Sequence, residues 1–281
     1  MENIVMTEET VFASIPQRPI TAHKGQVGRV LLICGSMGFT GAATLCAMGA
    51  LRSGAGLVYV GVPKSIYPIV AGKLNEAIVF PLPQYKGSLS VFAGKELKKR
   101  FDKIDCVVIG PGLGKSKGVL KAVKTVLKSY EGPVVLDADG INLLSGNMDI
   151  MRGRTGPLVL TPHEGEFSRI CNATGSRTER AVALAKALSA VVILKGHNSV
   201  ITDGSTTYIN PTGNPGMAVG GSGDVLSGIV GTFLAQNIPP VQAAACAAWV
   251  HGKAGDICAD EIGVRGMLPT DMVNVLPRLL K

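Results

Sequence analysis

Aromatic side chains are scarce in this chain of 281 residues: phenylalanine, tryptophan and tyrosine together make up 5% of it. Proteins that bind nucleic acid stack bases on such rings and gather their lysines and arginines into a patch. Here the basic residues are scattered, and the one dense cluster, Lys98–Arg100, is typical of a solvated helix face. We therefore expect no nucleic-acid partner. The net charge of +8 indicates either solubility or a field that attracts anionic ligands such as nucleotides.

Charged residues make up only 17% of the chain, yet uninterrupted apolar runs of membrane-spanning length are lacking. Glycines break the uncharged stretch Val30–Leu51, and Asn237–Pro240 breaks the stretch Val225–Gly252. A span needs about 20 consecutive apolar residues. Residues 1–10 are acidic and contain no apolar segment of a secretory signal. These features predict a soluble protein with no membrane partner.

The six cysteines never occur as C-x-x-C, and most of them lie inside apolar runs. This placement is typical of small core residues and disfavours both a disulfide framework and a cysteine metal site. A reducing, cytoplasmic location is therefore expected. The cysteines are Cys34, Cys46, Cys106, Cys171, Cys246 and Cys258.

Short runs rich in valine, isoleucine and leucine recur along the first 210 residues, with helical stretches between them. Such runs predict strands buried on both faces of a parallel sheet. Expected strands are 30–34, 57–60, 106–109, 134–136, 158–160, 191–194 and 200–202. Because Asp203–Gly204 is a hairpin-type turn, 206–209 is expected to pair antiparallel with the strand before it, at the edge of the sheet.

Helical spacing between and after these runs completes the predicted architecture. The expected helices are 41–52, 116–130, 177–189, 223–236, 241–259 and 270–279. The alternation predicts an α/β fold with one mainly parallel central sheet and helices on both faces. The chain contains no linker-like composition and no repeat, so we expect a single domain over residues 1–281.

A glycine-rich turn, Gly220-Gly221-Ser222-Gly223-Asp224, leads directly into an apolar helix. The glycines allow a tight turn, and Ser222 is expected to cap the helix. Several N–H groups then point at one spot at the positive end of the helix, which predicts an anion hole for phosphate. Asp224 fits either of two roles. It can stabilise the helix N-terminus, or it can act as the base for an attacking hydroxyl.

Three further segments follow expected strands, and open α/β sheets bind ligands at that end of their strands. Ile109–Ser116 is glycine-rich but is not a P-loop, since Ile109 stands where glycine is required; a tight structural turn is the alternative. Thr161–Phe167 contains His163, Glu164 and Glu166, yet H-E-x-x-H fails at Phe167, and the acids suit the first turn of a helix. Leu194–Ser199 contains Lys195, which could meet a phosphate or extend into solvent.

Together these segments resemble the ADP/ATP-dependent NAD(P)H-hydrate dehydratases of the ribokinase-like superfamily. The resemblance runs nearly from end to end, and its specificity comes from many weak motifs occurring in order. The motifs are His23–Gly25, Gly35–Ser36, Gly41–Ala43, Ala50–Gly56, Gly110–Gly114, Leu136–Gly140, Thr161–Phe167, Lys195–Gly196, Asn210–Asn214 and Gly220–Asp224.

The resemblance implies a repair reaction that uses ADP or ATP with Mg²⁺ and restores NADH or NADPH from the S epimer of its hydrate. The substrate hydroxyl is phosphorylated transiently and leaves as phosphate. By position, Asp224 resembles the catalytic base, and it contacts the hydrated dinucleotide together with Ala42, Gly112 and His163. The nucleotide contacts implied by position are Lys195, Gly196, His197, Asn198, Ser199 and Gly223.

Departures from the family pattern bear on the metal site and on the size of the protein. In related kinases, which carry P-N-x-x-E, the acid helps to hold Mg²⁺ through water. Here His163 departs from that pattern by replacing the asparagine, while Glu166 stands at the position of the acid, and the resemblance implies the metal role for it. Ser222 stands where threonine is frequent, and its hydroxyl could do the same work. The 22 residues before His23 are too few for the epimerase domain of many relatives. The resemblance also implies a homotetramer.

Two other functions remain open at this point. One is a kinase of the same superfamily that phosphorylates a vitamin precursor, such as a hydroxyalkyl thiazole or a pyrimidine, and releases a stable product. The other is a nucleotide-binding sensor without catalysis. Replacement of Asp224 would leave a sensor functional and would inactivate an enzyme.

Overall fold

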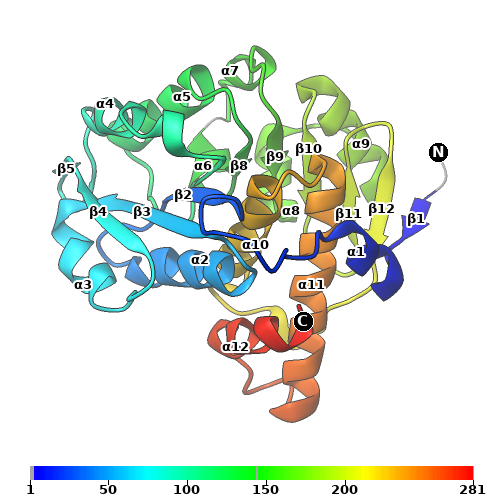
Figure 1. Ribbon diagram of the computed structural model, residues 1–281. Helices are drawn as coiled ribbons and strands as arrows, with labels where there is room; N and C mark the ends of the chain where they lie inside the picture. The colour runs from blue at the N-terminus through cyan, green and yellow to red at the C-terminus, as the bar shows by residue number, and fades with distance from the viewer. Residues whose placement is uncertain (1–2, 144, 281) are drawn as a thin grey trace.

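The computed structural model describes residues 3–143 and 145–280. A ten-stranded sheet with the order β1-β12-β11-β10-β9-β8-β7-β2-β3-β4 runs through the molecule (Figure 1). Its strands are β1 (Asn3–Val5), β2 (Arg29–Ile33), β3 (Leu57–Pro63), β4 (Ile78–Leu82), β7 (Cys106–Ile109), β8 (Val134–Leu136), β9 (Leu158–Leu160), β10 (Val191–Leu194), β11 (Ser199–Thr202) and β12 (Thr207–Asn210). A small hairpin, β5 (Gln84–Tyr85) and β6 (Ser88–Leu89), stands apart from it.

Pairing within the sheet is parallel except where β11 lies between β10 and β12. The antiparallel β11–β12 hairpin is as predicted, but the expectation that it forms the edge is wrong. Strand β1 continues the sheet by pairing parallel with β12, with Asn3 opposite Thr207. Strands β1 and β4 are not among those predicted from the sequence. Strand β1 is short and has polar neighbours in the sequence. Strand β4 contains Pro81, and a proline is tolerated there because β4 is an edge strand.

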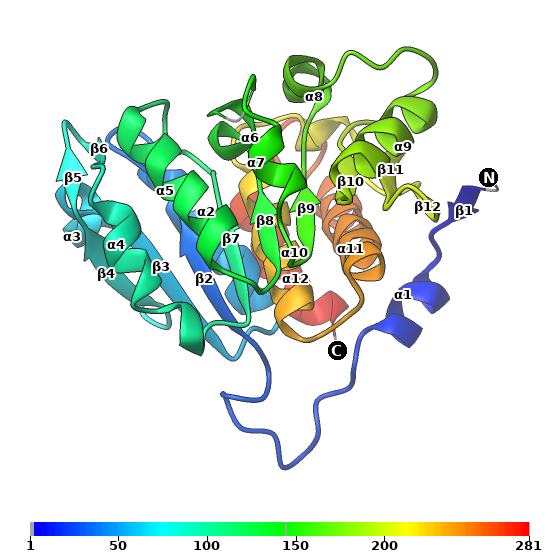
Figure 2. The ribbon, with the colours of Figure 1, turned by 90° about the horizontal axis from the view of Figure 1, so that it is seen from above.

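Helices cover both faces of the sheet (Figure 2), which confirms the predicted layers. One face carries α1 (Glu8–Ser14), α2 (Thr40–Arg52), α3 (Tyr67–Ala71), α10 (Ser222–Ala235), α11 (Pro240–Glu261) and α12 (Pro269–Leu279). The other carries α4 (Ala93–Lys98), α5 (Lys117–Ser129), α6 (Asp139–Leu143), α7 (Asp149–Arg152), α8 (Glu164–Ile170) and α9 (Arg177–Leu188).

The alternation of side chains along each strand explains the two layers. In β2, Val30 and Leu32 belong to one core and Leu31 and Ile33 to the other, and all four are fully buried. Because both faces are covered, the strands are continuously apolar, as expected for a buried parallel sheet.

Helices α2 and α10 cross in unusually close contact. A Cβ on Gly228 would lie 2.2 Å from the backbone oxygen of Cys46, and a Cβ on Gly49 would lie 2.5 Å from that of Val225. Only glycine fits at these two positions. The crossing fixes the first turn of α10 relative to the first turn of α2.

Among the described residues, no helix is long and apolar enough to cross a bilayer. All six cysteines are free, and five of them are buried, as expected for core residues.

Candidate active site

The carboxyl ends of β7, β8, β9 and β10 lie at one edge of the sheet, and the predicted site segments follow them directly. A cavity of about 880 Å³ opens there between the β10–β11 loop and the start of α10. Seven of the residues singled out from the sequence line it: His163, Lys195, Gly196, His197, Ser199, Ser222 and Gly223. The structure therefore brings together segments that are far apart in the chain.

The N-terminus of α10 has the geometry of an anion hole. Gly221 precedes the helix in a left-handed conformation, with φ +100°. The amide of Ser222 donates to the oxygen of Val219 (3.4 Å) and that of Asp224 to the oxygen of Gly221 (3.1 Å). The Gly223 amide has no acceptor within the described part of the chain, so it remains available for an anion at the positive end of the helix.

The expectation that Ser222 caps this helix is wrong. The cap residue is Gly221, and no side chain bonds to the free amides. The Ser222 hydroxyl is buried and points instead at the Met272 sulfur, 4.0 Å away. His251 on α11 lies behind the turn, with Nε2 2.9 Å from the Ser222 carbonyl oxygen. Burial lowers the pKa of His251 to about 4, so it is neutral near pH 7 and supports the turn without adding charge.

Asp224 is a partly buried carboxyl in the first turn of α10. Burial and then the negative charge of Asp137 raise its pKa to about 7, against the opposing attraction of Lys195. Asp139 raises it further. A carboxyl with this pKa exchanges a proton readily near neutral pH, as general acid–base catalysis requires.

Lys195, at the end of β10, points toward the start of α10. Its ammonium nitrogen lies 3.1 Å from Asp137 Oδ1 and 3.8 Å from Glu166 Oε2. Burial lowers the pKa of Lys195, but the attraction of the two carboxylates outweighs it, and the pKa is raised. A Cβ on Gly223 would lie 3.3 Å from this nitrogen. The predicted nucleotide contacts Lys195 and Gly223 are therefore neighbours.

Asp137 was not predicted as a site residue, although its motif contributed to the resemblance. The side chain is 1% exposed and accepts hydrogen bonds from Thr161 Oγ1 (2.7 Å), Lys195 Nζ (3.1 Å) and Ser227 Oγ (2.8 Å). The next residue, Ala138, has φ +47°, a conformation that a residue with a Cβ rarely adopts. Aspartate is common at such turns, and the sequence gives no sign that three groups converge on this one.

His163 and Glu166 form the N-terminal cap of α8. His163 Nδ1 accepts from the amides of Gly165 (3.0 Å) and Glu166 (3.3 Å), and Glu166 Oε2 accepts from the His163 amide (3.0 Å). This reciprocal pair is a capping box with histidine in place of serine. His163 is exposed at the cavity, whereas Glu166 is 5% exposed and faces Lys195.

The alternative interpretation of Glu164 holds. Its carboxylate points away from the cavity and pairs with Arg177 and Arg180. No group of three or more histidine, cysteine, aspartate or glutamate side chains within residues 3–143 and 145–280 has the arrangement of a metal site.

Ala42 and Gly112, predicted to contact the hydrated dinucleotide, also meet. A Cβ on Gly112 would lie 2.7 Å from the Ala42 Cβ, and Gly112 has φ +60°. The loop around Gly112 is anchored by Ser36 Oγ, which donates to the Gly112 oxygen (2.8 Å), and by Asp139, which accepts from the Gly114 amide (2.8 Å). Ala42 and Gly112 do not line the cavity described above, whereas His163, the third predicted contact of the hydrate beside them, does.

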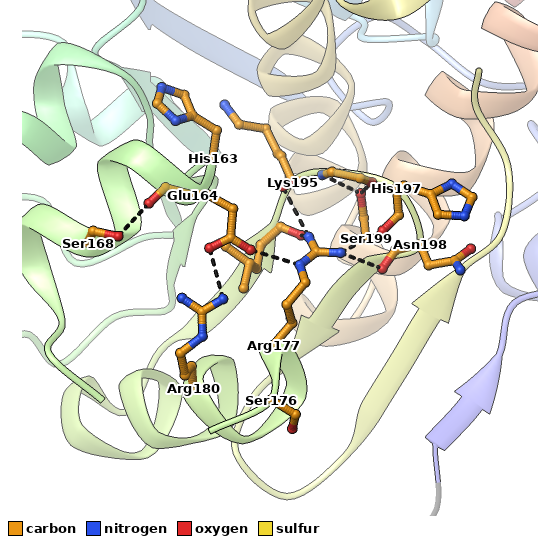
Figure 3. A network of polar contacts seen from close by, with 12 residues as sticks. His163, Glu164, Ser168, Ser176, Arg177, Arg180, Lys195, His197, Asn198 and Ser199 are labelled. Carbon is orange, nitrogen blue, oxygen red and sulfur yellow. Dashed lines mark hydrogen bonds and ion pairs between the residues drawn. The ribbon is translucent and has the colours of Figure 1, made fainter. Parts of the chain in front are cut away.

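The β10–β11 loop, Lys195–Ser199, is as predicted a turn between two strands. Gly196 and Asn198 both have positive φ, +148° and +52°, and the Gly196 amide and oxygen both bond to Ser199 Oγ. Figure 3 shows the loop between α10 above it and Arg177, which reaches it from α9 below. Arg177 lies next to the predicted nucleotide contacts but was not singled out from the sequence.

Comparison with known proteins agrees with this geometry. Residues 30–278 match the family described as NAD(P)H-hydrate dehydratase. The bifunctional NAD(P)H-hydrate repair enzyme of Moorella thermoacetica is 43% identical over 277 residues, which cover 96% of this chain and 52% of that enzyme. The chain thus spans about half the length of the first curated relatives it matches.

Two solved structures are similar over nearly their whole length. A ribokinase-like superfamily protein of Enterococcus faecalis has a TM-score of 0.86 at 30% identity, covering 99% of this chain and 95% of the other. The ADP/ATP-dependent NAD(P)H-hydrate dehydratase of Bacillus subtilis, co-crystallised with ATP and Mg²⁺, has a TM-score of 0.84 at 33% identity, covering 99% and 98%. The resemblance inferred from the sequence is confirmed: the chain belongs to the NAD(P)H-hydrate dehydratase family and has its ribokinase-like fold.

Proposed function

We propose that this chain catalyses the nucleotide-dependent dehydration of the S epimer of hydrated NADH or NADPH, with ADP or ATP as phosphoryl donor. One observation carries the proposal: Asp224, a carboxyl with a pKa of about 7, stands in the first turn of α10 beside the free Gly223 amide and the Lys195 ammonium. A base, an anion hole and a fixed positive charge at one point are the groups that transfer of a phosphoryl group to a hydroxyl needs.

The chemistry follows from these groups. Asp224 takes the proton of the substrate hydroxyl. At the same time the oxygen of that hydroxyl bonds to the terminal phosphorus of the nucleotide, and the bond between this phosphorus and the rest of the nucleotide breaks. The carbon–oxygen bond then breaks as the ring nitrogen donates its electron pair, and phosphate leaves. Loss of a proton from the neighbouring carbon restores the double bond. Phosphorylation is useful here because phosphate is a far better leaving group than hydroxide.

The residue roles are proposals supported by position in the structure. Ala42, Gly112 and His163 would hold the hydrate, with Asp224 at its hydroxyl. Lys195, Gly196, His197, Asn198, Ser199 and Gly223 would hold the nucleotide, and Gly220, Gly221, Ser222 and Gly223 would form the anion hole. The support is that one cavity is lined by His163, Lys195, Gly196, His197, Ser199, Ser222 and Gly223, and that Gly112 packs directly against Ala42.

A magnesium ion fits this set of residues only as a partner of the nucleotide. Mg²⁺ is usually held by phosphates, waters and one or two carboxylates. Glu166 is a buried carboxylate beside Lys195, and because it already accepts from the His163 amide, it would hold the ion through water. When bound, Mg²⁺ would neutralise charge on the transferring phosphate.

A homotetramer in a reducing cytoplasm and a single domain over residues 1–281 remain part of the proposal. Six free cysteines support the reducing location, and one sheet that contains strands from Asn3 to Asn210 supports the single domain.

The test is incubation of the protein with freshly hydrated NADPH, Mg²⁺ and either ADP or ATP, following the return of absorbance by the reduced ring. We expect recovery of NADPH that depends on nucleotide and releases one phosphate for each molecule repaired. A stable phosphorylated product would instead indicate a kinase. Nucleotide binding without turnover of any hydrate would indicate a sensor.

A further inference from the structure

Arg177 is the first residue of α9, and its guanidinium lies directly beneath the Lys195–Ser199 loop (Figure 3). Its backbone is fixed by a capping box in which Ser176 and Glu179 bond reciprocally. Its side chain is 31% exposed, yet it makes five hydrogen bonds, which equals the number of N–H donors that arginine has.

Four of the five bonds end on backbone carbonyl oxygens, three in the Lys195–Ser199 loop and one on Leu194, the last residue of β10. Nη2 donates to the oxygens of Leu194 (3.0 Å) and Lys195 (3.1 Å), and Nη1 donates to those of His197 and Asn198. The fifth, from Nε, goes to Glu164 (2.8 Å). The absence of a side chain at Gly196 leaves room for the guanidinium, because a Cβ on Gly196 would lie 2.8 Å from Arg177 Nη2.

Because Arg177 binds the loop carbonyl oxygens on one side of the loop, the amide N–H groups of the same peptide units point to the opposite side. In a trans peptide the N–H points opposite to the C=O of the same unit. With the oxygens of Lys195, His197 and Asn198 turned to the guanidinium, the amides of Gly196, Asn198 and Ser199 point away from it. The Gly196 amide donates to Ser199 Oγ within the turn, whereas the Asn198 amide has no acceptor among the described residues. Gly196, His197 and Ser199 line the cavity, and Arg177 does not. Amides in a turn that contains positive-φ residues, as Gly196 and Asn198 are here, are a recurring way to bind anions.

We propose that Arg177 is a positioning residue for nucleotide binding: it holds the loop carbonyls on the far side, so that the loop offers N–H donors to the nucleotide. The inference rests on the proposed function, because it takes the nucleotide to bind at this loop. Arg177 touches no ligand itself and acts through the backbone.

Arg180 provides a matched control one helical turn along α9. It contacts the same partner, with Nη2 2.9 Å from Glu164 Oε2, and its guanidinium lies over the Phe167 ring at 5.3 Å. No loop carbonyl is among its partners in the described residues. The two arginines therefore share the ion pair and the helix but differ in contact with the loop.

The experiment compares Arg177→Met, Arg177→Lys and Arg180→Met by direct titration with ADP and with ATP, alongside the KM for the hydrate. We expect Arg177→Met to weaken nucleotide binding at least about tenfold while the KM for the hydrate stays within about twofold. Arg180→Met should bind nucleotide within about twofold of wild type. Arg177→Lys should be intermediate, because one ammonium cannot reach four carbonyls.

Chemical rescue separates positioning from folding. Free guanidinium ions at low concentration should restore part of the nucleotide affinity of Arg177→Ala and change nothing in Arg180→Ala. The proposal is overturned if Arg177→Met binds nucleotide like wild type, or if both methionine variants lose nucleotide and hydrate alike. If Arg177→Met does not fold, the Arg177→Lys variant provides the test: nucleotide affinity equal to that of wild type in Arg177→Lys also overturns the proposal. A wild-type protein that binds neither nucleotide would refute the proposed function instead.

Discussion

The Gly110–Gly114 loop and the Lys195–Ser199 loop both follow strands at the same edge of the sheet, but different forces hold them. The first is packed tightly, in addition to its hydrogen bonds with Ser36 and Asp139: a Cβ on Gly110 would lie 1.8 Å from the Asp137 oxygen, and one on Gly112 would meet Ala42. Charge holds the second, since Arg177 binds its carbonyls and Asp137 binds the Lys195 ammonium. We therefore expect added volume to do most damage at the Gly110–Gly114 loop, proposed to contact the hydrate, and loss of charge to do most damage at the Lys195–Ser199 loop, proposed to bind the nucleotide.

The largest effect is expected at Asp224, which belongs to neither loop. Asp224→Asn keeps the shape of the side chain and removes the base, so turnover should fall by at least about 100-fold. Nucleotide affinity should hold or tighten, because a negative charge near the phosphate is gone. Dehydration rate and nucleotide titration on one preparation of folded protein provide the measurement. If turnover of the variant stays within a few-fold of wild type, Asp224 is not the catalytic base and only stabilises the N-terminus of α10.

Gly112→Ala tests the steric side. The added methyl would lie 2.7 Å from the Ala42 Cβ, in a backbone conformation with φ +60°, so the loop must shift. We expect kcat/KM for the hydrate to fall by about tenfold or more, with nucleotide affinity within about twofold. Gly114→Ala is a useful comparison. It has a similar φ of +73° but open space, with Ser36 Oγ 3.8 Å away, so its effect should be smaller.

Asp137→Asn tests the electrostatic side. The amide keeps the shape but no longer attracts the Lys195 ammonium, so nucleotide binding should weaken by roughly three- to tenfold. Asp139→Asn is the counterpart in the same turn, because Asp139 supports the Gly114 amide instead. It should raise the KM for the hydrate and leave nucleotide binding nearly unchanged. Equal effects of both variants on both ligands would show that the turn acts as one structural unit.

The smallest effect is a shift in the pH profile. Asp224 must be deprotonated to act as a base, so kcat/KM should fall as the pH drops below about 7. The charged groups that set this pKa are Asp137, Lys195 and Asp139. Removing the negative charge of Asp137 should move the acidic limb to lower pH, and removing that of Asp139 should move it less. A limb that stays in place in both variants would mean that another group controls it.

Much of the fold could be predicted because its strands are buried on both faces. Continuous apolar runs as short as Val191–Leu194, bounded by turn residues and rich in β-branched side chains, are typical of such strands. Edge strands lack that signal: β1 is exposed along its length, and it joins the sheet only through β12, some 200 residues later in the chain, as the register of Asn3 with Thr207 shows. Such pairing follows from tertiary contacts and not from local pattern.

The candidate site residues that belong to sequence motifs could be predicted, whereas the residues that hold those motifs in place could not. The glycines before Asp224 and the Lys195 turn are recognisable in the sequence. Arg177 looks like an ordinary surface residue of an amphipathic helix until the fold places it under the loop. The Ser222 cap was wrong because Gly221, in a left-handed conformation, already turns the chain into the helix.

The glycine crossing of α2 and α10 has a consequence for motion. Ala42 lies in the first turn of α2 and Asp224 in the first turn of α10, and backbone contact at Gly49 and Gly228 joins the two helices. We therefore expect any opening that admits the proposed hydrate to come from the loops, with the two helices moving together. Amide hydrogen exchange should be slowest where these helices cross and fastest in the Lys195–Ser199 loop, and bound nucleotide should slow only the latter.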